Sequence, residues 1–231
     1  MNYLKSGLHR KIFLLVLIVK LTNLHGQVLV HEEPRHHPVF QNKQIRILNV
    51  LILPGDTSQY HIHTTPSLFI RISSTTTGSQ LQGGKASTGK SIAGTILFEN
   101  LAFPNTRTHR VWNADKDTFN VMDVELLSND TGFVQNPLTL PELKLELDTG
   151  WVRAYRLTLF KGKEFMLRNK KQSFILVSPN AATIQTKQSG KSQYQTLVPG
   201  SFIDIKRRHS FTLKNVTDNT VQFILLELPV Q

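Results

Sequence analysis

One strand-forming pattern occurs twice in the sequence, and this repeat limits the possible fold more than any other feature. Residues 45–56 read IRILNVLILPGD and residues 152–163 read VRAYRLTLFKGK, so an arginine-bearing apolar run leads into a Gly turn each time. Further on, residues 113–126 (NADKDTFNVMDVEL) are echoed by residues 215–228 (NVTDNTVQFILLEL). Self-similarity over this distance predicts two copies of one structural unit.

The apolar residues recur at strand spacing, as in residues 45–53 and 119–127, and no long stretch keeps a helical period. We therefore predict an all-β protein made of two tandem β-barrels or sandwiches. Asn, Asp, Gly and Pro cluster near residues 128–141, as is typical of a connection between units. The predicted units are residues 27–135 and 136–231.

Residues 1–26 differ from the rest of the chain. A basic start, an apolar run at residues 12–19 and a polar stretch ending at Gly26 are typical of a secretory signal peptide. Cleavage after Gly26 would give a secreted or periplasmic protein. A retained membrane helix is the weaker alternative, because the run is short and Lys20 interrupts it. We expect no membrane span in the mature form.

Charge and cysteine content exclude several classes of function. The formal net charge is +11 at pH 7, and the chain has no cysteine. A basic surface suits an anionic ligand, but without an arginine-rich run or a basic-aromatic motif we expect no nucleic-acid partner. The absence of cysteine excludes disulfides, thiolate metal sites and cysteine nucleophiles. Asn129 and Asn215 begin glycosylation sequons, which matter only in a eukaryote.

Two histidines in the stretch QYHIHTTPS are the first candidate metal ligands. On a strand, His61 and His63 would project from the same face. A bare His-x-His pair is a weak signal, and a hydrogen-bonded pair without metal is the alternative. The context strengthens the signal, because Gly55 lies six residues before His61 and a third histidine, His109, follows in PNTRTHRVWN.

These segments resemble the two motifs of the cupin superfamily, G-x5-H-x-H-x3 or 4-E-x6-G and G-x5-P-x-G-x2-H-x3-N. The resemblance implies two cupin-type barrels of the double-stranded β-helix or jelly-roll kind. It also implies that His61, His63 and His109 bind a divalent metal ion, with iron favoured and manganese, nickel, copper or zinc as alternatives. Ser67 or Leu68 stands where the family has its glutamate ligand, and Thr106 replaces a motif glycine.

The missing glutamate leaves two interpretations open. A site of three histidines would keep positions free for substrate and dioxygen. Alternatively, Ser67 marks a change toward a metal-free pocket for a small ligand, with the histidines satisfied by hydrogen bonds.

The second copy has lost these residues. At the offset of 107 that relates Arg46 to Arg153, the positions of His61 and His63 become Arg168 and Lys170, which we expect to be solvated. Phe174 replaces Ser67. We therefore predict a degenerate, structural C-terminal barrel that closes a two-barrel core or contributes to a homodimer.

Two other signals have simpler interpretations. Residues 84–91 (GKASTGKS) match the phosphate-binding pattern G-x4-G-K-[ST], but no helix is predicted after them, so we interpret them as a flexible loop. His31, Glu33, His36 and His37 could form an accessory metal patch on an extended segment that could cross to the other barrel. Exposed histidines are the preferred interpretation there.

The sequence thus predicts an exported metal-binding cupin, with candidate activity as a dioxygenase-like or other metal-dependent enzyme, such as an isomerase, on a small organic substrate. The alternative is a non-catalytic small-ligand-binding or structural cupin without metal. No side chain stands out as a catalytic acid or base, and a fold alone does not choose between these functions.

Overall fold

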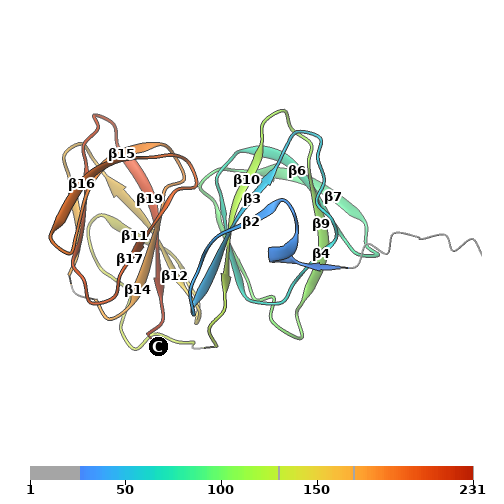
Figure 1. Ribbon diagram of the computed structural model, residues 1–231, viewed down its shortest axis with the longest axis horizontal. Helices are drawn as coiled ribbons and strands as arrows, with labels where there is room; N and C mark the ends of the chain where they lie inside the picture. Colours follow the sequence, from blue (N-terminus) through green and yellow to red (C-terminus); the bar gives the residue numbers. More distant parts are fainter. Residues whose placement is uncertain (1–26, 130, 169, 231) are drawn as a thin grey trace, which may run out of the picture.

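The computed structural model describes residues 27–129, 131–168 and 170–230 and consists of two β-lobes lying side by side (Figure 1). Two sheets form each lobe, and the single helical element is a short 3-10 turn, η1 (Val30–Glu32), within these residues. The all-β prediction with two tandem barrels is confirmed. The predicted signal peptide lies outside the described residues and stays a prediction. No helix in the described part of the chain has the length and apolar character needed to cross a membrane.

The first lobe contains two five-stranded sheets, with strand orders β1-β4-β9-β6-β7 and β2-β3-β10-β5-β8. Its strands are β1 (Val28–Leu29), β2 (His36–Gln41), β3 (Ile45–Ile52), β4 (His61–His63), β5 (Ser67–Arg71), β6 (Thr75–Leu81), β7 (Ala86–Ser91), β8 (Ile96–Glu99), β9 (Arg107–Asn113) and β10 (Phe119–Leu126). All pairings are antiparallel except that of β1 with β4.

The second lobe has a five-stranded sheet of order β11-β12-β19-β14-β17 and a four-stranded sheet of order β13-β18-β15-β16. Its strands are β11 (Leu143–Asp148), β12 (Arg153–Leu159), β13 (Glu164–Leu167), β14 (Ser173–Val177), β15 (Ala182–Gln188), β16 (Lys191–Leu197), β17 (Phe202–Ile205), β18 (Phe211–Asn215) and β19 (Val221–Leu228). The predicted boundary between residues 135 and 136 falls in the connection from β10 to β11.

Each repeated arginine pairs with the glutamate at the end of its copy. Arg46 on β3 lies opposite Glu125 on β10, and its Nη1 donates to Glu125 Oε2 at 2.8 Å. In the second lobe Arg153 on β12 lies opposite Glu227 on β19, with 3.6 Å between Nη1 and Oε2. The two copies of the sequence pattern therefore occupy the same positions in the two lobes.

The repeated asparagines hold equivalent turns. Asn113 Nδ2 donates to the carbonyls of Ile52 and Asp117, at 2.9 and 2.8 Å. Asn215 Nδ2 donates to the carbonyls of Leu159 and Asn219, at 3.0 and 2.7 Å.

The backbone carbonyl of each asparagine also accepts a hydrogen bond from the backbone N–H of a turn glycine, Gly55 in the first lobe and Gly162 in the second, at 3.1 Å in both. These glycines have φ values of 75° and 71°, a region that favours glycine over other residues. Because Asn215 is fully buried, its sequon cannot accept a glycan in the folded protein, whereas Asn129 is exposed.

The two lobes share one apolar core. Residues of β3, β5 and β10 that face away from the first barrel's interior pack against those of β12, β14 and β19 that face away from the second, including Ile47, Ile70 and Val124 on one side and Ile175 and Ile224 on the other. Burial of these apolar side chains between the lobes stabilises the contact.

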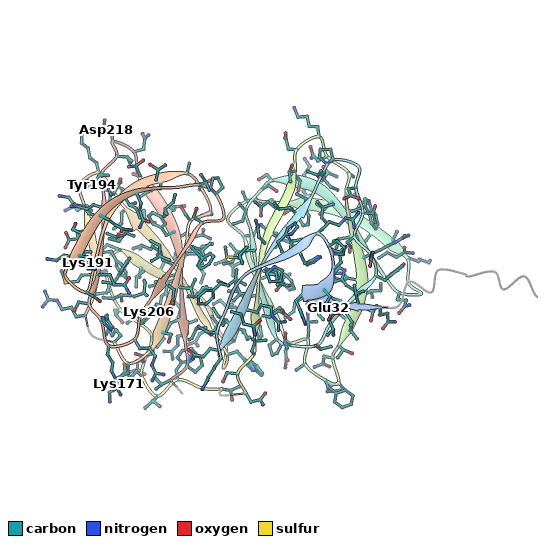
Figure 2. All side chains as sticks on the ribbon, viewed as in Figure 1. Glu32, Lys171, Lys191, Tyr194, Lys206 and Asp218 are labelled. Atoms are coloured by element: carbon teal, nitrogen blue, oxygen red, sulfur yellow. The ribbon has the colours of Figure 1, made fainter. Side chains whose placement is uncertain are left out.

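The interiors of the lobes differ. Large apolar side chains fill the second barrel, among them Tyr155, Phe165, Phe174, Phe211 and Phe223, each at most 1% exposed. Exposed charged side chains of this lobe include Lys191, Lys206 and Asp218, which Figure 2 labels. The corresponding apolar cluster of the first barrel is smaller and leaves a cavity.

The segment that matches the phosphate-binding pattern is a strand, so the prediction of a flexible loop is wrong. Ala86–Ser91 forms β7, which pairs with β6 in register from Thr75↔Ser91 to Gln80↔Ala86. Its Ser and Thr side chains suit an extended conformation, and glycines at 83 and 84 allow the tight turn before it. The next element is β8 and not a helix, so the segment has no phosphate-binding geometry.

Candidate metal centre

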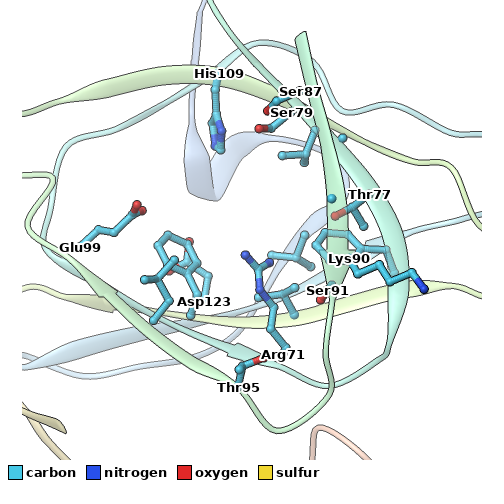
Figure 3. A pocket seen from close by; sticks show the side chains of 18 of the residues that line it. Arg71, Thr77, Ser79, Ser87, Lys90, Ser91, Thr95, Glu99, His109 and Asp123 are labelled. Atoms are coloured by element: carbon cyan, nitrogen blue, oxygen red, sulfur yellow. The ribbon is translucent and has the colours of Figure 1, made fainter.

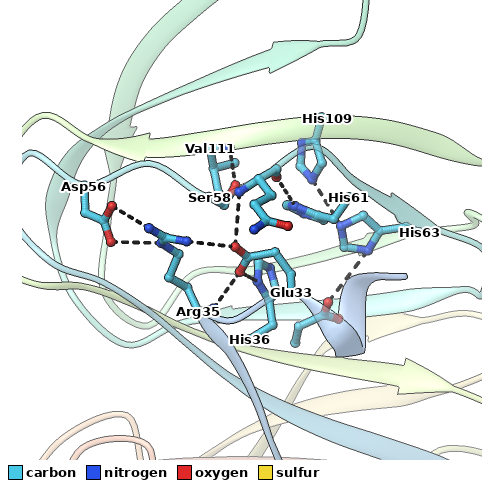
Figure 4. Close-up of polar contacts among 11 residues, drawn as sticks. Glu33, Arg35, His36, Asp56, Ser58, His61, His63, His109 and Val111 are labelled. Atoms are coloured by element: carbon cyan, nitrogen blue, oxygen red, sulfur yellow. Dashed lines mark hydrogen bonds and ion pairs between the residues drawn. The ribbon is translucent and has the colours of Figure 1, made fainter. Parts of the chain in front are cut away.

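The three predicted ligands lie together inside the first barrel. β4 carries His61 and His63, and it pairs with β9 so that His61 lies directly opposite His109. One nitrogen from each imidazole lies within 4.8 Å of the other two (Figure 4). Strand alternation turns all three side chains inward, and His61 and His63 are 0% and 2% exposed.

Each of the three rings takes part in a hydrogen bond. His61 Nδ1–H donates to the Gln59 carbonyl at 3.0 Å, which leaves Nε2 without a proton. That Nε2 is buried and has no partner among the described residues. His63 Nε2 lies 3.1 Å from His109 Nε2, so the two rings meet through the nitrogens that face the centre of the cluster.

The cluster keeps its imidazoles neutral. Burial lowers the pKa of His61 to about 4 and that of His109 to about 2, and the other nearby positive charges act in the same direction. Burial likewise lowers the pKa of His63 well below its usual value, with His109 and His61 adding to the effect. Neutral imidazoles are the form that binds a metal ion.

No carboxylate occupies the position where the cupin motif places its glutamate. Ser67 begins β5 and is fully buried, and its hydroxyl donates to the Thr65 carbonyl at 3.4 Å.

A carboxyl group that the motif comparison missed lies nearby on β10. Asp123 is 0% exposed, and its Oδ2 is 3.8 Å from His63 Nδ1. Neither carboxyl oxygen has a hydrogen-bond partner within the described residues. Burial raises the pKa of Asp123 well above its usual value, and the charge of Glu125 adds to this. Asp123 follows Phe119 and Val121 at every second position of β10, so the strand period places it on the same, cavity-facing side. This spacing is the signal by which the sequence could have indicated it.

The expectation of exposed histidines near residue 36 is wrong for His36 and correct for His37. His36 is 4% exposed, and its ring centroid lies 4.5 Å from that of His61. Its Nδ1–H donates to Glu33 Oε2 at 2.7 Å. Among the described residues, His31, Glu33, His36 and His37 do not form a metal-binding cluster. The segment does not cross to the other barrel, because β2 pairs with β3 of its own barrel.

Glu33 anchors this N-terminal segment to the histidine strand. Besides His36, its carboxylate accepts from the backbone N–H groups of Arg35 at 2.7 Å and Gln59 at 3.1 Å. Arg35 in turn forms a two-bond ion pair with Asp56, at 2.8 Å for each bond. Burial acts to raise the pKa of Glu33, but these hydrogen bonds outweigh it and lower the pKa to about 2. Figure 4 shows the chain of contacts from Asp56 to His61.

The histidines open onto a cavity of about 440 Å³ (Figure 3). This volume lies within the usual range for small-molecule sites. One wall is apolar, with Val50, Phe69 and Val121, and another is the hydroxyl-bearing β6–β7 hairpin. Arg71 projects into the cavity from the sheet opposite His109.

The second barrel has no equivalent of the cluster in its described residues. Asn215 corresponds to Asn113, so Phe211 takes the position of His109, and its partner across the sheet is Leu167. The counterpart of His61 is therefore Leu167 and not Arg168, as the constant offset predicted. The turn after Gly162 is one residue shorter than the turn after Gly55, which moves an apolar residue to the inward position.

Solved structures share this two-barrel architecture, so the cupin resemblance seen in the motifs is confirmed for the fold. A variant of salicylate 1,2-dioxygenase from Pseudoaminobacter salicylatoxidans in complex with gentisate matches with a TM-score of 0.62 and 11% identity, over 89% of this chain and 76% of that one.

Two other solved structures match over most of their length. AerE from Microcystis aeruginosa matches with a TM-score of 0.56 and 13% identity, over 85% of this chain and 98% of that one. YhaK from Escherichia coli matches with a TM-score of 0.55 and 17% identity, over 87% and 95%. No protein-family model and no curated protein sequence matches the chain. At these identities the likeness concerns the fold.

Proposed function

We propose that the N-terminal barrel binds one divalent metal ion through His61, His63 and His109 and acts with it on a small organic molecule, in a dioxygenase-like or related metal-dependent reaction. The observation that carries this proposal is the set of three imidazoles, with nitrogens within 4.8 Å of one another, at the wall of a cavity. The dioxygenase structure of the same fold is consistent with it.

The residues present fit a metal ion. His61 Nε2 is a buried nitrogen without a partner, and its other nitrogen is held by the Gln59 carbonyl, an arrangement that prepares a histidine to bind metal. A divalent ion there would supply Lewis acidity and, as iron, the ability to activate dioxygen. Three histidines without the glutamate leave more than one coordination position for other molecules.

The chain's own residues would orient the reactants and exclude water. Asp123 Oδ2 faces His63 Nδ1 at 3.8 Å, so a small approach would let this carboxyl group accept a hydrogen bond from the ring and orient it. Val50, Phe69 and Val121 cover the opposite side with apolar surface, which strengthens polar interactions within the cavity.

A metal-free small-ligand-binding cupin is the second candidate. The 3.1 Å contact between His63 Nε2 and His109 Nε2 favours it, because one nitrogen then donates to the other and both are satisfied without a metal ion. This candidate keeps the cavity and gives it a binding role only.

Metal content distinguishes the two candidates. Protein purified without a histidine tag is analysed by elemental mass spectrometry, before and after reconstitution with iron, manganese, nickel, copper or zinc. We expect about one metal ion per chain in the wild type and none in the His61→Ala/His63→Ala double variant. His37→Ala is the matched control, because His37 is an exposed histidine on the same lobe. Equal metal content in wild type and double variant would exclude the site.

We also propose that the chain is exported and cleaved after Gly26, on the basis of the basic, apolar and polar segments of residues 1–26. Intact mass measurement of the protein from a secreting host tests this. A chain that keeps residues 1–26 would contradict it.

A further inference from the structure

Arg71 is the one guanidinium on the cavity wall that has no anionic partner. It ends β5, opposite Val121 of β10, and its side chain forms no hydrogen bond or ion pair with any other described residue. Its guanidinium carbon lies 5.6 Å from the ring centroid of Phe119, which packs against it as an apolar support. Figure 3 shows it directed into the cavity.

The second guanidinium on the cavity wall already has a carboxylate partner. Arg107 is paired with Glu99 through two hydrogen bonds, one of them 2.8 Å from Nη1 to Oε1. The Asp123 carboxyl group lies against His63, with 3.8 Å between Oδ2 and Nδ1. Lys90 also lines the cavity, from an exposed position on β7. Arg71 is therefore the buried cation of the cavity that has no carboxylate within ion-pair distance, although Glu99 and Asp123 line the same cavity.

An unpaired guanidinium in such a position costs stability, because the charge has lost part of its hydration without gaining a counterion. Burial lowers the pKa of Arg71 accordingly. A planar guanidinium binds a carboxylate through two parallel hydrogen bonds, and this pairing would recover the lost interaction. A single positive charge matches a carboxylate better than a doubly charged phosphate.

The wall beside Arg71 is also polar. On the β6–β7 hairpin Ser79 lies opposite Ser87 and Thr77 lies opposite Gly89, and all four line the cavity. The hydroxyl groups of these residues make no hydrogen bond within the described chain, so they are free to bind polar substituents of a ligand. Gly89 adds space, since no atom lies within 4 Å of where its side chain would begin.

We infer that the cavity binds a small organic carboxylate, with the carboxylate on Arg71 and the remainder of the molecule directed toward the three histidines. Arg71 is thus a specificity-determining residue. This inference names the substrate class of the proposed site and, for the role of the histidines, rests on the proposed function.

The test measures binding by thermal shift and calorimetry, first on chelator-treated and then on metal-loaded protein. The probes are lactate, gluconate and benzoate, each beside its neutral primary amide, with inorganic phosphate as a further anion. We expect at least one carboxylate to bind wild-type protein, with its amide about tenfold weaker or more, as for a hydrogen bond to a charged group.

Arg71→Gln should lose that preference for the acid, and Arg71→Lys should keep part of it. Arg110→Gln is the matched control, because Arg110 lies next to His109 on β9 but bonds Gln80 on the other face of the strand. Melting temperatures without ligand show whether each variant is folded. If Arg71→Gln does not fold, Arg71→Lys still tests the inference.

The outcomes separate this inference from the proposed metal site. Arg71-dependent binding of a carboxylate to chelator-treated protein supports the inference even if the chain takes up no metal. Binding of no carboxylate, equal binding of acid and amide, tighter binding of phosphate, or full retention in both Arg71 variants would overturn it. None of these results changes the metal content by which the proposed function is judged.

Discussion

At the scale of single residues, Glu33 shows how strongly the fold sets the charge of a buried group. Its carboxylate is 1% exposed and accepts hydrogen bonds from one histidine and two backbone N–H groups. These bonds are made to the ionised form, so they stabilise the folded state only while Glu33 is charged.

We therefore expect the stability provided by Glu33 to depend on pH. Its pKa is about 2 in the folded protein against 4.5 for an ordinary glutamate, so the stabilisation is complete above about pH 4.5 and is lost as the pH falls toward 2. Glu33→Gln should lower the free energy of unfolding by roughly 3 kcal/mol at neutral pH. Urea denaturation at neutral pH and at about pH 3 measures the difference in unfolding free energy between wild type and Glu33→Gln. This difference should be smaller at the lower pH, and the control Glu32→Gln, at an exposed position, should change the unfolding free energy little at either pH.

Asp123 shows where motif comparison stops being informative. The spacing of His61, His63 and His109 identifies residues that the structure brings together, because strand pairing preserves local spacing. Asp123 comes from a strand on the other sheet, and no short pattern links it to the histidines. Its side chain meets His63 only through the way the two sheets face each other.

For the same reason the sequence did not indicate a role for Arg71, and His36 was predicted to be exposed although it is buried against His61. Each is a polar residue whose importance depends on which side of a strand faces the cavity. Only the folded arrangement supplies that information.

At the scale of elements, the β6–β7 hairpin owes its shape to two glycines with different roles. Gly78 packs beneath the indole ring of Trp112 from β9, and a methyl group there would overlap that ring. Gly89, in the neighbouring strand, faces open space.

Gly78→Ala should therefore destabilise the protein by about 1–3 kcal/mol or more, because Trp112 or the hairpin must move. Gly89→Ala is the matched control and should leave the stability nearly unchanged. Denaturant unfolding followed by tryptophan fluorescence measures both. Equal stability of the two variants would contradict the packing role given to Gly78.

The asparagine-held turns allow a second test at this scale. Asn215→Asp removes the amide donors that bind the carbonyls of Leu159 and Asn219, and it places a charge in a fully buried position. Burial of an unsatisfied group predicts a loss of about 2 kcal/mol or more in the free energy of unfolding. Asn129→Asp, at an exposed position, should have little effect. A thermal melt of each variant decides the matter.

At the scale of the whole molecule, the shared core predicts that the two barrels unfold together. Ile224 is fully buried on β19 among residues of both lobes. Ile224→Ala should lower the free energy of unfolding by about 2–5 kcal/mol while the transition stays single. Hydrogen exchange of amides in β9 and β18 reports on each barrel separately, and both should lose protection equally. Unchanged protection in β9 would show that the barrels are independent; the exposed Ile92→Ala is the control.

The overall architecture could be predicted because the repeat and the strand period are local properties of the chain. Arg46 and Glu125, like Arg153 and Glu227, are written into both copies and meet across adjacent strands. The strand β7 could not be predicted, because a segment of Ser, Thr and Gly has the composition of a loop. The alignment of Leu167 with His61 could not be predicted either, because comparing the two copies at one constant offset does not reveal a one-residue deletion between them.

The parallel pairing of β1 with β4 has a practical consequence for handling the protein. Val28 lies beside His61 and Leu29 beside Ile62, so β1 is an edge strand paired with β4, the strand that carries two of the histidines. A purification tag fused directly ahead of Gln27 would crowd this edge, whereas one fused after the final strand would lie on the other lobe. Biochemists preparing the protein should therefore place affinity tags at the carboxyl end.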